Sequence, residues 1–126
     1  EYAKSFGVSA VIENVPEPFP FVMKSVEEFD RFYDEVGVEA FMVLDVAHAH
    51  LRGEELEFIK RFEDRISHVH VSDNHGDGDT HLRIGEGSVA WGEVIEALRG
   101  SPFDGWVTIE SHGAIAECVR LLEGLK

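Results

Sequence analysis

Residues 40–45 read Ala-Phe-Met-Val-Leu-Asp, an apolar run of strand length that ends in an acidic residue. Polar side chains do not alternate with the apolar ones, so we expect a strand that is buried on both faces, as in a parallel sheet. Similar runs predict three further strands at residues 8–15, 66–71 and 106–110. The intervals between these strands are wide enough for a helix in each connection.

The segments that follow the strands show the helical spacing of apolar residues. Ser25 stands at the capping-box distance from Glu28 and predicts the start of a helix that ends at Gly37. Further helices are predicted at residues 54–65, 90–99 and 113–124. The residues expected to face the core from these three helices are Leu56, Ile59, Phe62, Trp91, Val94, Ile95, Leu98, Ile115, Val119 and Leu122.

Alternating strands and helices predict an α/β fold with a parallel sheet. A doubly wound sheet and part of a (β/α) barrel both fit, but no GxGxxG motif or P-loop follows a strand, which weakens the nucleotide-binding version. We expect residues 1–126 to form one domain of four βα units; if the barrel is the right architecture, they form a parallel half-barrel that a second copy or a missing N-terminal half would complete. Residues 1–6 indicate a helix end capped by Gly7, so we expect the natural chain to be longer or processed.

Composition narrows the classes of function. The chain carries 25 acidic residues against 11 basic ones, a formal net charge of −14, which disfavours nucleic acid and anionic membranes as partners. No apolar run reaches roughly 18 residues, so no membrane span is expected. The one cysteine, Cys118, excludes an internal disulfide framework and favours the cytoplasm, and its place on the apolar side of the last helix indicates a core residue.

Each predicted strand presents a metal-type ligand at its end: Glu13, Asp45, His70 and Glu110. Parallel strands place these ends on one rim, where three carboxylates without a partner would repel one another. A divalent cation removes that repulsion, and carboxylates with one imidazole suit Mn²⁺, Mg²⁺, Co²⁺ or Zn²⁺. The alternative is that these acids cap helices or lie in solvated loops, but their repetition over four strands favours the metal.

Three further histidines extend this pattern. His48 follows Asp45 by three residues, a spacing that lets both side chains face one cavity. His68 shares a strand face with His70 but lies deeper, where packing is the more common role. His81 and Asp79 form a DxH motif in the polar loop 72–88, which is either a pair of additional ligands or a solvated stretch. The glycines of Gly85-Glu86-Gly87 indicate unusual backbone angles at a tight turn.

Together these motifs resemble the xylose-isomerase-like TIM-barrel superfamily, which includes sugar isomerases, ketose 3-epimerases and the endonuclease IV type of AP endonuclease. The resemblance covers essentially the whole chain and matches the last four βα units of an eight-unit barrel. It rests on Glu13-Asn14, Asp45-x-x-His48, His68-Val69-His70-x-x-Asp73, Asp79-x-His81, Gly85-Glu86-Gly87 and Glu110.

The resemblance implies different roles in different branches. In the isomerase and epimerase branch, the four strand-end residues fall on single-metal ligand positions and His48 on a substrate-contacting position. That branch often presents an arginine shortly after the histidine strand, and Arg83 is the nearest candidate here. In the nuclease branch, His48, Asp79 and His81 also fall on zinc-ligand positions, and two more histidines come from the first half of the barrel.

Three functions remain as hypotheses. The first is a divalent-metal-dependent sugar isomerase or epimerase that acts through an enediolate, with Glu13 and Glu110 as acid and base. The second is zinc-dependent cleavage of phosphodiesters at abasic DNA, favoured by the DxH motif and opposed by the net charge. The third is an inactive half-barrel, whose exposed strand edges a homodimer would cover.

Overall fold

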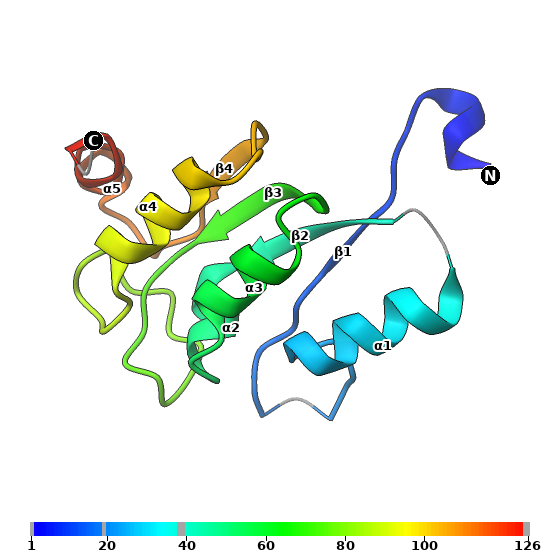
Figure 1. Ribbon diagram of the computed structural model, residues 1–126. Helices are drawn as coiled ribbons and strands as arrows, with labels where there is room; N and C mark the ends of the chain where they lie inside the picture. The colour runs from blue at the N-terminus through cyan, green and yellow to red at the C-terminus, as the bar shows by residue number, and fades with distance from the viewer. Residues whose placement is uncertain (1, 19, 38–39, 125–126) are drawn as a thin grey trace.

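The computed structural model describes residues 2–18, 20–37 and 40–124, in which four parallel strands form one open sheet. The strands lie side by side in their chain order, β1-β2-β3-β4 (Figure 1). They are β1 (Val11–Glu13), β2 (Phe41–Asp45), β3 (Ile66–Val71) and β4 (Trp106–Ile109). The predicted half-barrel of alternating strands and helices is confirmed.

The helices between the strands follow the predicted segments closely. They are α1 (Val26–Val36), α2 (Val46–His50), α3 (Glu55–Arg61), α4 (Trp91–Gly100) and α5 (Ile115–Gly124), after a 3₁₀ turn, η1 (Ala3–Phe6). The capping box of Ser25 and Glu28 begins α1, and Gly37 ends it with a φ of 59°. Gly7 caps η1 as expected with a φ of 69°, whereas Glu1 lies outside the described residues.

The hydrophobic core lies between the sheet and helices α1, α3 and α4, which run along one of its faces (Figure 1). Val69 and Val71 of β3 are fully buried against these helices. The rings of Phe29 in α1 and Phe58 in α3 meet edge to face, with centroids 5.5 Å apart. Because side chains alternate along a strand, His68 and His70 of β3 lie on the opposite face, which is only partly buried.

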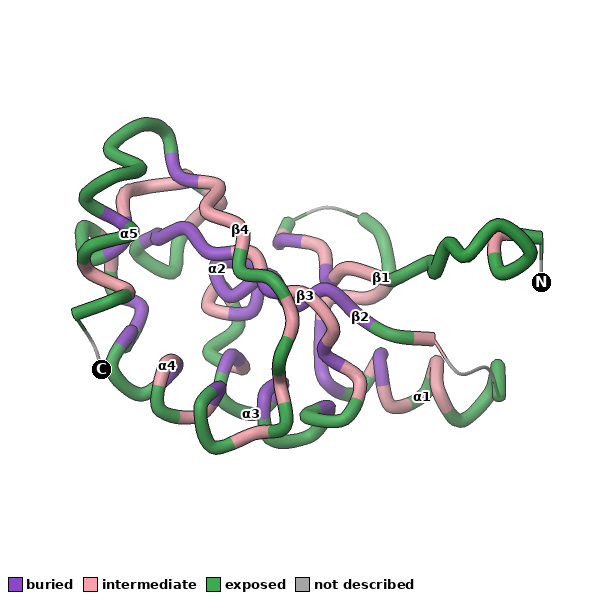
Figure 2. The backbone as a smooth tube through the Cα atoms, turned by 90° about the horizontal axis from the view of Figure 1, so that it is seen from above, coloured by how far each residue is buried: buried purple, intermediate pink, exposed green. Residues whose placement is uncertain are grey.

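The outer strands are not buried on both faces, which corrects the expectation from their apolar sequences. Trp106 at the start of β4 is 80% exposed, and Val11 of β1 is 43% exposed. Figure 2 shows the start of β4 and most of the stretch before β1 in the exposed class. The reason is that β1 and β4 are the two edges of the open sheet, so each pairs with only one other strand in the described part of the chain.

Two helices also differ from expectation. Helix α5 buries Cys118 completely, as predicted, but Ile115 and Val119 are exposed because their side of the helix has no neighbour in the described part of the chain. Helix α2 was not predicted: Asp45 caps it by accepting the N–H of His48, so the strand passes directly into a single turn. Leu56 of α3 is exposed as well, beside the buried Ile59.

No helix in the described ranges is long and apolar enough to cross a membrane.

Candidate metal centre

Four side chains from the four strands meet at the carboxyl end of the sheet, and we call them the strand-end group: Glu13, Asp45, His70 and Glu110. Asp45 and His70 are directly paired in register between β2 and β3. The Nδ1 atom of His70 lies 3.1 Å from Oε1 of Glu13 and 3.2 Å from Oε1 of Glu110. One potential ligand atom from each residue lies within 4.8 Å of the others.

Asp45 is the buried member of the strand-end group. Its Oδ1 atom accepts the N–H of His48 at 2.8 Å, whereas its Oδ2 atom is buried and has no hydrogen-bond partner. Burial raises the pKa of Asp45 to about 6, and the nearby carboxylates of Glu13 and Glu110 add to the rise, while His48 opposes it. A buried carboxylate oxygen without a donor, beside two more carboxylates, is the electrostatic setting that a divalent cation fits.

Asn14 holds the backbone around Asp45, a role that the sequence motif did not reveal. Its Oδ1 atom accepts the N–H of Asp45 at 2.7 Å, and its Nδ2 atom donates to the carbonyl of Asp45 at 2.9 Å. Its own carbonyl accepts from Nδ1 of His48 at 2.7 Å. This completely buried amide therefore joins the ends of β1 and β2 and aims His48. Its place directly after Glu13 was the available signal.

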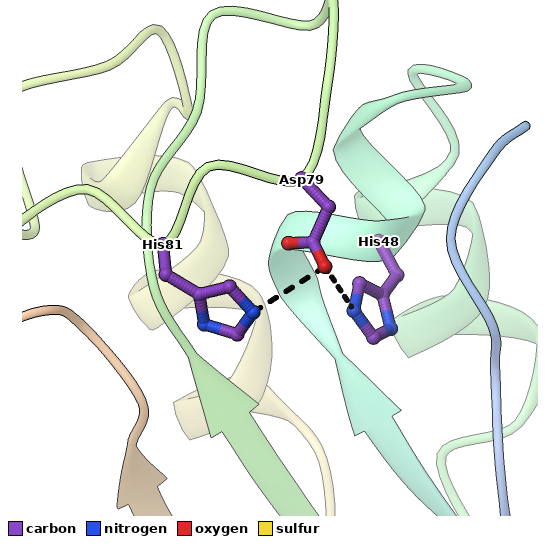
Figure 3. Close-up of side chains that lie close together, drawn as sticks. All are labelled: His48, Asp79 and His81. Carbon is purple, nitrogen blue, oxygen red and sulfur yellow. Dashed lines mark ion pairs between the residues drawn. The ribbon is translucent and has the colours of Figure 1, made fainter.

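A second cluster, the loop group, consists of His48, Asp79 and His81. The Oδ2 atom of Asp79 lies 3.3 Å from Nε2 of His48 and 3.3 Å from Nε2 of His81. Figure 3 shows the carboxylate between the two rings, which come from α2 and from the loop after β3. The other oxygen of Asp79, Oδ1, is buried without a hydrogen-bond partner.

The tautomers of both rings follow from their other contacts. Nδ1 of His48 faces the carbonyl of Asn14, and Nδ1 of His81 faces the carbonyl of Glu110 at 2.9 Å. Because a carbonyl only accepts, each Nδ1 carries a hydrogen, and each neutral ring directs its Nε2 lone pair at Asp79. The two lone pairs and the carboxylate of Asp79 repel one another, and a proton or a metal ion between these atoms removes the repulsion. A ring N–H that donates to a carbonyl is also typical of metal-bound histidine.

The protonation of His81 agrees with this arrangement. Burial lowers the pKa of its imidazole, but the carbonyl of Glu110 and the charge of Asp79 outweigh that effect, and the pKa is raised overall. The backbone of His81 also has a φ of 49°, in the left-handed region that side chains other than glycine seldom adopt. The loop group thus combines one carboxylate between two imidazoles with backbone strain at His81.

The two groups are neighbours, joined through His48. Its Nε2 atom lies 3.7 Å from the unpartnered Oδ2 atom of Asp45 and 3.3 Å from Asp79. Carboxylates and imidazoles therefore form a continuous polar patch along the carboxyl ends of the strands. This patch offers ligand sets for one cation at the strand-end group and for another at the loop group.

The loop that carries Asp79 and His81 takes its shape from Asp73. The buried carboxylate of Asp73 accepts four hydrogen bonds, from the N–H groups of Asn74, Gly85 and Val89 and from Nε1 of Trp91, at 2.8 to 3.2 Å. An antiparallel bridge between Asp73 and Leu82 closes the same loop. Gly85 has a φ of 88°, which confirms the predicted unusual turn geometry.

Two sequence candidates lie outside both groups. Arg83 pairs with Glu86 at 3.1 Å, and its Nε atom is buried without a partner; no hydrogen bond or ion pair joins it to either group in the described residues. His68 accepts or donates a 2.7 Å hydrogen bond with Thr108, and its ring meets that of His70 edge to face at 5.1 Å. His68 therefore forms a polar layer beneath the strand-end group.

Known proteins of similar sequence and structure indicate the family of this chain. The family model described as xylose isomerase-like TIM barrel matches residues 1–125. An uncharacterized protein of Methanocaldococcus jannaschii is 33% identical over 133 residues, which cover 100% of this chain and 44% of that protein. The crystal structure of a D-tagatose 3-epimerase-like protein superposes with a TM-score of 0.88 at 27% identity, covering 98% of this chain and 48% of that one.

Two other solved structures share this architecture. One is a D-allulose 3-epimerase from Methylomonas sp. in complex with D-allulose, with a TM-score of 0.76 at 26% identity, covering 90% of this chain and 38% of that one. The other is the IOLI protein with a bound zinc atom, with a TM-score of 0.75 and coverage of 98% and 49%; at 20% identity it shows the fold alone.

The chain spans less than half the length of these proteins. The family match nonetheless extends over nearly all of its residues, and the strands of the half-barrel stand in the order that the sequence predicted. The resemblance found in the sequence is therefore confirmed, and the chain belongs to the xylose isomerase-like TIM barrel family.

Proposed function

We propose that the chain carries the catalytic half of a divalent-metal-dependent sugar isomerase or epimerase. The observation that carries this proposal is the strand-end group, in which three carboxylates and an imidazole converge around the unpartnered Oδ2 atom of Asp45. Similarity to structures of sugar 3-epimerases supports the substrate class. The net charge of −14 suits a neutral sugar better than an anionic polymer.

The residues of the strand-end group would hold the cation, which is Mn²⁺, Mg²⁺, Co²⁺ or Zn²⁺ by the chemistry of its donors. When bound, a divalent ion supplies positive charge that stabilises negative charge on the oxygens of a sugar. The imidazole of His70 lies between Glu13 and Glu110 and sets the distance between their carboxylates.

The reaction itself falls to the two carboxylates at the edges of the sheet. Glu13 ends β1 and Glu110 follows β4, so they approach a bound sugar from opposite sides. One carboxylate removes the proton from the carbon beside the carbonyl, and the other returns a proton, as the direction of reaction requires. His48 hydrogen-bonds a substrate oxygen through Nε2, whereas Arg83 is paired with Glu86 and is given no step in the reaction.

Loss of the imidazole at position 70 is expected to weaken metal binding and to abolish proton exchange. With added Mn²⁺, the wild-type chain should incorporate deuterium from D₂O into a ketose beside its carbonyl, whereas His70→Ala should show background exchange and roughly tenfold weaker metal binding or worse. Elemental mass spectrometry and NMR measure the two effects. His75→Ala serves as the control, because His75 is exposed in the loop after β3 and belongs to neither group. Equal metal content in His70→Ala would remove His70 from the ligand set.

The loop group favours a second candidate, zinc-dependent phosphodiester hydrolysis at abasic DNA. Asp79, with the lone pairs of two histidines directed at it, suits a second ion next to the first. The net charge opposes binding of DNA. Two or more zinc ions per chain together with nicking of an abasic duplex would favour the nuclease, and two ions without nicking would leave the isomerase as the better proposal.

The chain alone is expected to form a homodimer that closes a barrel edge to edge. Trp106 and Val107 on β4 and Val11 on β1 are exposed apolar residues on unpaired strands, and pairing two copies would cover them. Size-exclusion chromatography with light scattering should give about twice the mass of one chain. Trp106→Lys should shift the population toward the monomer, and a monomeric wild type would contradict the closed pair.

A further inference from the structure

His50 lies where the two ends of the loop 74–88 come together. It is the last residue of α2, and its Nε2 atom lies 2.8 Å from the hydroxyl of Ser88 at the far end of the loop. At the near end, a Cβ atom placed on Gly76 would lie 3.9 Å from the same Nε2 atom. The imidazole therefore bonds the far end of the segment that carries Asp79 and His81 and lies near its other end.

Glu55 fixes the direction of this ring. Its Oε1 atom lies 2.9 Å from Nδ1 of His50, and the residue is only 8% exposed at the start of α3. Because a carboxylate only accepts, Nδ1 carries the hydrogen and Nε2 is the acceptor. The single hydrogen of the Ser88 hydroxyl has two acceptors in reach, Nε2 of His50 at 2.8 Å and the carbonyl of Asn74 at 3.3 Å, and the shorter contact is the one to His50. The neutral ring is thus fully bonded, with one nitrogen committed to α3 and the other to the loop.

The hydrogen bonds from Ser88 to His50 and from His50 to Glu55 resemble those of a hydrolytic triad. The neighbouring backbone amides, however, are not placed to assist a nucleophilic attack by Ser88. The N–H of Ser88 donates to the carbonyl of Asn74 at 2.8 Å. The N–H of Val89 donates to Asp73 at 3.2 Å. Neither amide is free to hold an oxyanion beside the hydroxyl, so the network is built to hold the loop.

We propose that His50 is a positioning residue for the loop group: through Ser88 it holds the loop against α2, so that Asp79 and His81 face His48. His48 and His50 lie on the same short helix, and a shift of the loop relative to α2 changes the distances on which the loop group depends. The role of His50 in ordering the loop does not depend on any metal ion. Its effect on a bound ion rests on the proposed metal site at the loop group.

Ser88→Ala tests the proposal first on the metal-free chain. Loss of the hydroxyl, which contacts His50 and the carbonyl of Asn74, should speed hydrogen–deuterium exchange of the loop amides between residues 75 and 82 by about fivefold. Ser101→Ala is the matched control, because Ser101 also makes one short hydrogen bond, to the carbonyl of Leu98 at 2.8 Å, but far from the loop. Exchange that is equal in the two variants would overturn the positioning role.

Zinc affinity is a second measurement, which increased flexibility in another part of the chain would not change. Chelator competition should show about tenfold weaker binding of the second ion in Ser88→Ala and His50→Phe, with the first ion unaffected. His50→Gln, which keeps a hydrogen-bonding group near the position of Nε2, should recover part of the loss. Unchanged affinity of a second ion despite faster exchange would also overturn the proposal. If the wild-type chain binds only one ion but Ser88→Ala still speeds exchange in the loop, the positioning role stands and only the second metal site is contradicted.

Discussion

Replacing Glu110 with Gln is expected to slow proton exchange at the sugar by roughly a thousandfold while the chain stays folded. The carboxylate of Glu110 lies 3.2 Å from His70 and is 32% exposed, so it reaches both the strand-end group and a bound substrate. An amide has almost the same shape but cannot take up the proton. The backbone bonds of Glu110 to Val71 and His81 do not involve the side chain and remain.

Deuterium incorporation from D₂O, followed by NMR, measures this loss directly. Glu86→Gln is the matched control, because Glu86 pairs with Arg83 on an exposed part of the loop and makes no contact with the strand-end group. The control should exchange at a rate close to that of the wild type. If Glu110→Gln stays within about tenfold of the wild-type rate, Glu110 is neither the acid nor the base.

Gly87→Ala should have the largest effect on stability. A Cβ atom at this position would collide with the carbonyl oxygen of Asn74 and with Oδ1 of Asp73. Both atoms are fully buried and hydrogen-bonded, so the loop can relieve the collision only by breaking the bonds that Asp73 makes. We expect a loss of about 3 kcal/mol in the free energy of unfolding, or about 10 °C in the melting temperature.

Gly92→Ala provides a control of opposite sign. Gly92 lies inside α4, and a Cβ atom there would meet nothing within 4 Å. Alanine in a helix should therefore stabilise the chain by about 0.5 kcal/mol. Thermal unfolding followed by circular dichroism compares the two variants. A melting temperature of Gly87→Ala equal to that of Gly92→Ala would show that the loop rearranges without cost.

The fold followed from the sequence because its signals are local. Apolar runs, the capping box of Ser25 and Glu28 and the glycine at position 37 each act within a few residues, so strands and helices could be placed one by one. Burial of the edge strands could not be predicted in this way. The same apolar sequence serves a covered strand and an open edge, and only the neighbours of Trp106 decide which it becomes.

In the candidate site, too, some residues could be predicted from the sequence and others could not. Glu13, Asp45, His70 and Glu110 stand at strand ends, and parallel strands bring their ends together. The roles of Asn14, Asp73 and His50 depend on hydrogen bonds between segments distant in the chain, which no spacing reveals. Arg83 was chosen by its position after the histidine strand, and the structure pairs it with Glu86 instead of placing it against either group.

The order of the strands has a consequence for how the protein is assembled. Each strand pairs with the one before it in the chain, so during synthesis the sheet can grow by one βα unit at a time. Glu13 is made early, and Glu110 joins only when the last strand docks on β3. The carboxylate of Glu110 is therefore the last of the three to join the strand-end group.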